Sequence, residues 1–248
     1  MAGYEGIEVS AVTDMRPHLD LDRWREQAGE ITRISTDNGL EILSMEVSHP
    51  IEELLLKAFE ACAAMGIPIV NINSGGKSDT GSENDIEADF QRWTDTLAGF
   101  AEKAAEFGVT LCVKPHVTTS IYDTQTMLRA IEKITNPAFG IDMDPSHIYR
   151  AGEDPVQALP PVLHRVKHIH IRDCVGRGPG PGPAITQTCG RGEIDLMAFC
   201  KAVVDGGYSG PVCLEVIRAQ KLELPEVVII AAESYGYLNA CLKALGAR

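Results

Sequence analysis

Three short segments carry side chains that together could bind a divalent metal ion. Asp144 ends the strand-like part of Ile-Asp-Met-Asp-Pro-Ser-His, His170 closes a His-x-His pair that begins at His168, and Glu215 interrupts an apolar run from 212 to 217. A carboxylate inside an apolar strand is costly unless a cation or hydrogen bonds compensate its charge. Mixed carboxylate and imidazole ligation suits Mn²⁺, Mg²⁺, Co²⁺ or Zn²⁺. The sequence therefore predicts a metal site at Asp144, His170 and Glu215, with Mn²⁺ expected first.

The elements that must position these residues follow a strand–helix alternation. Short apolar runs of β type alternate with longer helical patterns, which is typical of a parallel sheet built from βαβ units. The expected strands are 6–11, 41–48, 68–73, 109–116, 139–144, 166–172 and 211–216, and the expected helices are 21–38, 51–65, 86–107, 124–134, 155–163, 196–205 and 226–245. In barrels of this kind the working side chains project from the carboxyl ends of the strands.

The pattern predicts one α/β domain over residues 1–248, a (β/α) TIM-type barrel of seven strand–helix units that lacks the first unit. An open barrel exposes two parallel edges, and exposed edges need cover. We expect a small partner subunit or a second copy of the chain to cover the gap. The alternative, that one strand escapes the pattern, stays open.

Charge and composition exclude several function classes. The formal net charge of −13 argues against a nucleic-acid or anionic-membrane partner, since both repel an acidic surface. No apolar run approaches the ~20 residues of a membrane span, and the N-terminus has no signal pattern. The seven cysteines form no Cys-x-x-Cys pair, so we interpret them as reduced residues of a cytoplasmic protein.

Almost every predicted strand ends in an ionisable or amide side chain. One such residue alone is usually a capping or surface residue, but a purely structural barrel would not place them on most of its strands. Besides the three metal ligands and His147, these strand-end candidates are Glu8, Asn73, Lys114, His116 and Asp173.

Read in order, these motifs resemble the xylose-isomerase-like TIM barrels. That family includes sugar-phosphate isomerases, ketose 3-epimerases and inosose-processing enzymes, and the resemblance covers nearly the whole chain. The motifs are Leu-Cys-Val-Lys-Pro-His, Asp144-x-x-His147, His168-x-His170-x-x-Asp173, Gly-Arg-Gly-Glu-Ile-Asp ending at Asp195, and Gly-Tyr-Ser-Gly-Pro-x-x-Leu-Glu ending at Glu215.

The resemblance implies a metal held by a strand-end Glu, the Asp of Asp-x-x-His, the second His of His-x-His and the last-strand Glu. In this chain Lys114 occupies the position of the first Glu. Because an ammonium has no lone pair, Lys114 cannot be a ligand unless it is deprotonated. His116, two residues on and on the same face, is our predicted fourth ligand. The predicted substrate contacts are Arg177, Asn73, Asp173 and Glu8.

The chemistry implied by the resemblance is proton removal next to a carbonyl, with the metal as Lewis acid. His147 is the expected base because an ordinary histidine titrates near neutral pH, and Lys114 would stabilise the developing oxyanion. The sequence looks most like the large subunit of a C-glycoside deglycosidase, a lyase that cleaves 3-oxo-glycosides with a small partner. An aldose–ketose isomerase or sugar 3-epimerase is the alternative, although the missing Glu counts against an epimerase.

Two further alternatives belong to other classes. Lys114 could form a Schiff base in a metal-free aldolase if burial lowered its pKa, or the barrel could be a sugar-binding subunit without activity. Two polar or glycine-rich stretches, Lys77–Asn84 and Gly176–Gly182, are candidate lids over the site.

Overall fold

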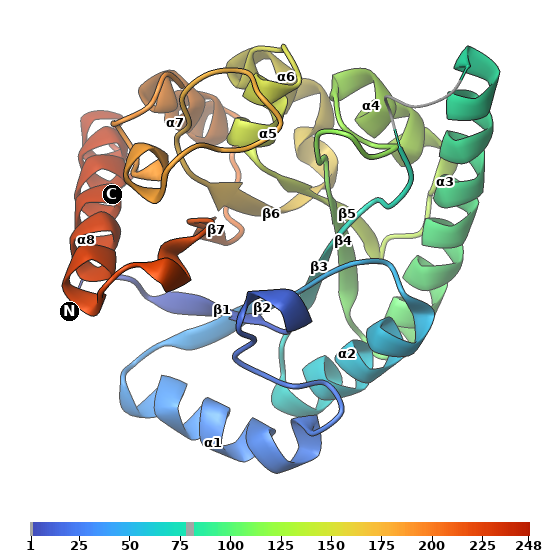
Figure 1. The fold of residues 1–248 in the computed structure, drawn as a ribbon, viewed down its shortest axis with the longest axis horizontal. Helices are drawn as coiled ribbons and strands as arrows, with labels where there is room; N and C mark the ends of the chain where they lie inside the picture. The colour runs from blue at the N-terminus through green and yellow to red at the C-terminus, as the bar shows by residue number, and fades with distance from the viewer. Residues whose placement is uncertain (1, 78–81) are drawn as a thin grey trace.

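Seven parallel strands form the frame of the molecule, which a computed structural model describes for residues 2–77 and 82–248. Each strand pairs with the next one in sequence, and the sheet curls into an open barrel with helices outside it (Figure 1). The strands are β1 (Gly6–Ser10), β2 (Glu41–Ser48), β3 (Ile69–Asn73), β4 (Thr110–Lys114), β5 (Phe139–Met143), β6 (Val166–Ile171) and β7 (Val212–Leu214). Within the described residues, the expected barrel of seven strands is confirmed.

Every predicted helix is present. These are α1 (Trp24–Asp37), α2 (Glu52–Met65), α3 (Glu83–Glu106), α4 (Thr124–Lys133), α6 (Pro155–Val162), α7 (Leu196–Asp205) and α8 (Leu224–Ala244), and single 3₁₀ turns lie at η1 (Thr13–Met15), η2 (Leu163–Arg165), η3 (Ala184–Gln187) and η4 (Ala219–Lys221). Of the two candidate lids, positions 78–81 of Lys77–Asn84 lie outside the described residues.

One helix was not expected from the sequence. The short helix α5 (Pro145–Arg150) begins directly after β5, in a segment outside the expected helices. Asp144 is its N-cap and accepts hydrogen bonds from the Ser146 backbone N (2.8 Å) and hydroxyl (2.7 Å). Pro145 fits the first helical position because its missing N–H would have no partner there. Helix α5 therefore fixes Asp144 and His147 on one rigid turn at the end of β5.

The two sides of the barrel differ in burial. Strands β3, β4 and β5 are buried along almost their whole length, as strands covered on both faces should be. Strands β1 and β7 are the edges of the sheet and are less buried; Val212 at the start of β7 is 46% exposed. Helix α8 lies on this side of the barrel (Figure 1), where Tyr4 hydrogen-bonds to the Ala231 carbonyl (2.9 Å).

The thiols and helices agree with a globular core. All seven cysteines are free thiols, and six of them are buried. Among the described residues, none of the helices combines the length and apolarity required for a membrane span.

Candidate active site

A cavity of about 250 Å³ opens at the carboxyl ends of the strands, where the sequence predicted the site. This volume is near the lower end for ligand pockets, which typically measure about 300–1,000 Å³. Its lining consists of Met15, Glu46, Ser48, Asn73, Lys114, His116, His147, Arg150, Arg172, Pro179, Pro181, Glu215 and Ile217. Pro179 and Pro181 belong to the predicted lid Gly176–Gly182, so this loop covers one side of the cavity.

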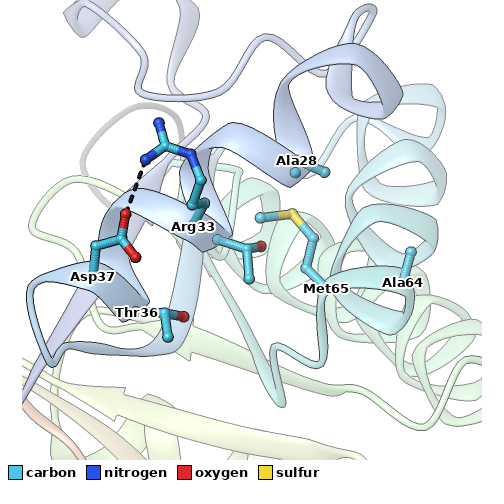
Figure 2. A pocket seen from close by; sticks show the side chains of 8 residues that line it. Ala28, Arg33, Thr36, Asp37, Ala64 and Met65 are labelled. Atoms are coloured by element: carbon cyan, nitrogen blue, oxygen red, sulfur yellow. Dashed lines mark hydrogen bonds and ion pairs between the residues drawn. The ribbon is translucent and has the colours of Figure 1, made fainter.

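Larger hollows lie elsewhere on the molecule, away from the carboxyl ends of the strands. One of about 450 Å³ lies between α1 and α2 and is lined by small side chains, Met65 and the ion pair between Arg33 and Asp37 (Figure 2). It lacks the cluster of buried ionisable side chains that the strand ends provide. We therefore assign the site to the smaller cavity at the strand ends.

Beneath the cavity, Asp142 clamps the two histidines of β6. Its Oδ1 lies 2.9 Å from Nδ1 of His168, and its Oδ2 lies 2.6 Å from Nδ1 of His170. All three side chains are fully buried. Burial by itself would raise the pKa of Asp142, but the two imidazoles hold it well below its usual range. His168 and His170 thus lie on the same face of β6, as their spacing of two residues along a strand requires.

Glu8 of β1 completes this buried group from across the barrel. Its Oε1 lies 2.6 Å from Nε2 of His170, and its Oε2 accepts from Ser44 (2.7 Å) and Asn71 (2.5 Å). Burial opposes ionisation of Glu8, but the His170 charge and hydrogen bond lower its pKa to about 2. Burial likewise opposes the charge of His170, and Asp142 and Glu8 raise its pKa well above the ordinary value. We call Glu8, Ser44, Asn71, Asp142, His168 and His170 the inner cluster.

A second group lies nearer the mouth and is organised by Arg172. This fully buried guanidinium lies 3.0 Å from Asp144 Oδ2 and 2.6 Å from Glu215 Oε2, and its Nε donates to Ser146 (2.7 Å). Asp144 and Glu215, two predicted metal ligands, are thus joined through a cationic side chain. We call Asp144, His147, Arg150, Arg172 and Glu215 the rim cluster.

Lys114 and Glu46 connect the two clusters. The Lys114 ammonium lies 3.1 Å from Glu215 Oε1, 3.2 Å from Glu46 Oε1 and 3.9 Å from Asp142 Oδ2. Burial alone would lower the pKa of Lys114, but Glu215 and Glu46 raise it well above its ordinary value. A Schiff-base nucleophile needs the opposite shift, because only the neutral amine attacks a carbonyl. These contacts therefore argue against the aldolase alternative.

His147 is surrounded by donors, which corrects one prediction. Arg150 lies 2.8 Å from its Nδ1, and Arg172 lies 2.9 Å from its Nε2. Burial and the Arg172 charge hold the pKa of His147 well below its ordinary value, so the expectation that it titrates near neutral pH is wrong. A neutral imidazole accepts a hydrogen bond through only one of its two nitrogens, so only one of these arginine contacts is a hydrogen bond at a time. The role of His147 as base stays a prediction.

Two other predicted residues line the same cavity. His116 hydrogen-bonds through Nδ1 to the Val117 carbonyl oxygen (2.7 Å), and its ring packs 4.1 Å from that of His147. Burial lowers the pKa of His116, so its Nε2 is available as an acceptor or ligand. Asn73 ends β3 and accepts from the Gly75 backbone N through its side-chain oxygen (2.9 Å).

Asp173 and Arg177 lie outside the cavity lining. Both Asp173 oxygens accept from backbone N–H groups, at Cys174 (3.0 Å), Ile194 (3.1 Å) and Gly190 (3.0 Å), so this buried carboxylate organises the loops after β6. Arg177 is exposed, stacks on Tyr149 and donates to its carbonyl (3.1 Å). Asp173 and Arg177 were predicted to contact the substrate, but the structure does not bring them together with the other site residues.

The sequence analysis missed Glu46, Arg150 and Arg172. Glu46 is the carboxylate in the otherwise uncharged stretch 42–48, the same signal that identified Glu215. Burial raises its pKa, and the Lys114 charge offsets only part of the increase. Arg172 stands one position before Asp173 in the motif. It also follows His168 and His170 at a spacing of two residues, and side chains at that spacing share one face of a strand. This spacing could have placed Arg172 in the barrel.

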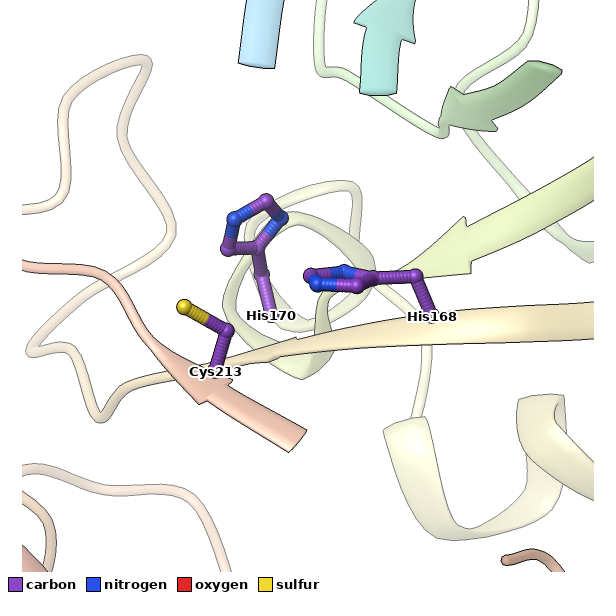
Figure 3. A group of neighbouring side chains, drawn as sticks. All are labelled: His168, His170 and Cys213. Atoms are coloured by element: carbon purple, nitrogen blue, oxygen red, sulfur yellow. The ribbon is translucent and has the colours of Figure 1, made fainter. Parts of the chain in front are cut away.

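Among the residues that the structure describes, two groups of side chains bring at least three potential ligand atoms within 4.8 Å of one another. One is His168, His170 and Cys213, whose side chains project from β6 and β7 (Figure 3). The other is Glu8, Glu46 and His170. The second group fits a divalent cation better, since it offers two carboxylates and Glu46 lines the cavity. The predicted pair Asp144 and Glu215 fits less well, because Arg172 already pairs with both and Lys114 pairs with Glu215.

Comparisons with known proteins agree with this arrangement of strands. A family model described as xylose isomerase-like TIM barrel matches residues 1–238. Inosose dehydratase from Lacticaseibacillus casei is 21% identical over 261 aligned residues, which cover 95% of this chain and 85% of that protein. The solved 3-keto-D-glucoside 4-epimerase YcjR from E. coli gives a TM-score of 0.74 at 19% identity, covering 97% of this chain and 90% of that one.

A further solved structure, described as IOLI protein with a binding zinc atom, gives a TM-score of 0.73 at 17% identity and covers 97% of this chain and 89% of that one. At these identities the structural matches show the fold, and the family assignment rests on the match over residues 1–238. The chain belongs to the xylose isomerase-like TIM barrel family.

Proposed function

We propose that the chain is a divalent-metal-dependent lyase that cleaves the bond between sugar and aglycone in 3-oxo-glycosides. The observation that carries this proposal is the set of three cations, Lys114, Arg150 and Arg172, in a cavity that two carboxylates and two imidazoles also line. Proton removal next to a keto group creates negative charge on the keto oxygen. Preorganised cations in a water-poor site stabilise such charge far better than water does.

The named relatives support carbohydrate chemistry of this type. One is a dehydratase, which is a lyase, and another is an epimerase of a 3-keto-D-glucoside. Elimination and epimerisation share the removal of a proton next to a keto group. We therefore propose that this chain is also an enzyme that acts on an oxo-sugar, and that its ligand is a small carbohydrate.

In the proposed reaction, His147 accepts the proton from carbon 2, which lies next to the 3-keto group. The electron pair of that C–H bond forms a double bond between carbons 1 and 2, and the aglycone leaves carbon 1 with the bonding pair and takes up a proton. Arg150 and Arg172 cover both nitrogens of His147 in the substrate-free site. The substrate must displace one of them, because a base has to lie within hydrogen-bond reach of the proton that it removes.

A bound divalent metal would supply Lewis-acid polarisation of a substrate oxygen. Zinc is present in the similar IOLI structure, and the donor set of this chain also accommodates Mn²⁺, Mg²⁺ or Co²⁺. His170 belongs to both the predicted ligand set and the Glu8–Glu46–His170 group. We propose His170 as the anchoring ligand.

Glu46 favours a sugar 3-epimerase or isomerase as the second candidate. The missing Glu at position 114 counted against an epimerase, which needs two proton carriers. Glu46 places a second carboxylate in the same cavity as Glu215, and its raised pKa suits proton transfer. The reaction products separate the two candidates.

We also propose that a small partner subunit or a second copy of the chain covers the gap between β1 and β7. Both strands are sheet edges, and apolar side chains are exposed nearby, at Val212 of β7 and at Leu224 and Val228 of α8. Unpaired parallel edges favour association. Light scattering of the purified chain, alone and after mixing with candidate subunits, tests this part of the proposal.

The activity is tested by incubating the chain with 3-oxo-glucosides that carry C- or O-linked phenolic aglycones, with and without Mn²⁺. Release of the free aglycone, identified by mass spectrometry, supports the lyase. An epimerised sugar without aglycone release points to the second candidate. Absence of both reactions, with and without a partner, overturns the proposal. His147→Gln is the matched negative control because it retains the size of the side chain.

A further inference from the structure

We propose that the divalent metal is bound by Glu8, Glu46 and His170 at the inner end of the cavity, and not by Asp144 and Glu215. This inference rests on the proposed function for the use of the metal, but the binding site itself is argued from contacts. Potential ligand atoms of the three residues lie within 4.8 Å of one another. Ligand atoms about 2.1 Å from a shared ion are roughly 3–4 Å apart, so small rotations complete the site.

His170 is oriented as a metal ligand should be. Its Nδ1 lies 2.6 Å from Asp142 Oδ2, which leaves Nε2 directed at Glu8. Its backbone N–H also donates to Asp142 (3.2 Å), so one carboxylate fixes both the strand and the ring. A carboxylate behind the imidazole is the usual support of a metal-bound histidine, because it selects the tautomer and the ring orientation.

The oxygen ligands are supported in the same way. Ser44 and Asn71 both donate to Glu8 Oε2, which fixes the carboxylate with its other oxygen towards His170. The side-chain oxygen of Asn71 is fully buried and has no hydrogen-bond partner in the part of the chain that the structure describes. A buried carbonyl oxygen without a donor is costly, and an oxygen-seeking cation beside Glu8 would satisfy it.

The charge balance of the whole site leaves room for one dication. In the metal-free site, Asp142 and Glu8 hold His170 protonated, and a metal that binds its Nε2 must displace that proton. Once His170 is neutral, the cationic side chains of the described site are Lys114, Arg150 and Arg172, and the carboxylates are Glu8, Glu46, Asp142, Asp144 and Glu215. The carboxylates exceed the cations by two charges. Buried charge without compensation is expensive, and one divalent ion removes this excess.

The position of Lys114 explains why the ion would lie on the inner side. Lys114 and Arg172 already neutralise Glu215, and Arg172 also pairs with Asp144. A dication between those carboxylates would meet two cations. Glu46 reaches the site from β2, with its Oε1 3.2 Å from the Lys114 ammonium, and offers a carboxylate in place of the one that position 114 lacks. When Glu46 binds the ion, Lys114 keeps its contact with Glu215.

The inference is tested by measuring Mn²⁺ binding to the whole chain by calorimetry and by elemental analysis after gel filtration. Glu8→Gln and Glu46→Gln should each weaken binding at least ~30-fold, since each removes a charged ligand of nearly unchanged shape. Asp144→Asn and Glu215→Gln should change the affinity less than ~3-fold. Glu41→Gln, at the exposed start of β2, is the surface control. Circular dichroism verifies that each variant is folded.

A crystal soaked with Mn²⁺ locates the ion directly by anomalous scattering. An ion ligated by Glu8, Glu46 and His170 supports the inference, even if the protein turns over no oxo-glycoside and the proposed function fails. An ion between Asp144 and Glu215 overturns it, even if the lyase activity is found. Failure of the unaltered chain to bind Mn²⁺, Zn²⁺ or Co²⁺ also overturns it.

Discussion

The inner cluster and the rim cluster both bury carboxylates, but they neutralise them with different partners. In the inner cluster, Glu8 and Asp142 pair with the imidazoles of His168 and His170. In the rim cluster, Asp144 and Glu215 pair with the guanidinium of Arg172. An imidazole can give up its proton and present a lone pair, whereas a guanidinium keeps its charge in proteins and has no acceptor. A metal can therefore enter the first cluster more readily than the second.

This difference suggests that the two clusters have separate roles, with the rim cluster at the substrate and the inner cluster at the metal. The rim lines the cavity and presents fixed positive charge at the place where a substrate oxygen would lie. The inner cluster lies deeper and offers an ion carboxylate oxygen, together with an imidazole nitrogen that becomes available when His170 gives up its proton. Lys114 lies between the two clusters and contacts both Glu46 and Glu215. A change in the charge of one cluster can therefore act on the other through Lys114.

The largest expected effect comes from breaking the centre of the inner cluster with Asp142→Asn. The change removes a fully buried charge that holds both histidines, so unfolding of the metal-free protein in urea should become easier by roughly 3–5 kcal/mol. Mn²⁺ affinity should fall about 10–100-fold, since the support of His170 is lost. Asp144→Asn serves as the rim comparison and should retain Mn²⁺ affinity. Equal losses in the two variants would contradict the division between clusters.

The second prediction distinguishes a loss of proton transfer from a loss of metal binding at His147 of the rim cluster. His147→Gln should lower kcat for aglycone release by about 10²–10⁴-fold, because the proposed proton acceptor is lost. Mn²⁺ affinity should stay within ~3-fold, since His147 belongs to the rim. Steady-state kinetics and metal titration on the same sample measure both quantities. Loss of the metal together with activity would mean that His147 is a ligand.

A pH titration of stability tests the ion pairs of the inner cluster. The pKa of Glu8 is lowered to about 2 from an ordinary value of 4.5, so its ion pair stabilises the fold fully above the ordinary value. This contribution, on the order of 3 kcal/mol, should disappear as the pH falls from about 4.5 towards 2. Urea unfolding across this range measures it. In Glu8→Gln the slope over the same interval should be visibly smaller, and an unchanged slope would assign the acid sensitivity to other carboxylates.

The sequence predicted the fold better than it predicted the partners of each side chain. Apolar runs and helical periodicity mark every strand and every longer helix around the site, because burial sets those patterns locally, whereas the six-residue helix α5 is too short to show such a pattern. The pairing of Glu8 with His170 joins residues 162 positions apart, and no local pattern reports which strand faces which across a barrel. Family motifs identified Asp144 and Glu215 but not the cation between them, since Arg172 belongs to no ligand set.

His116 gives the smallest and most selective test, because the sequence predicted it as the fourth metal ligand. In the structure it lines the cavity, its Nδ1 contacts its neighbour's carbonyl, and its ring packs on His147. His116→Asn should therefore leave Mn²⁺ affinity within ~3-fold and lower kcat about tenfold, through loosened packing of His147. In the double variant with His116→Asn and His147→Gln, the loss of kcat should then be smaller than the product of the two single losses, since His116 acts through His147. A tenfold loss of Mn²⁺ affinity in His116→Asn would instead return the metal to the rim.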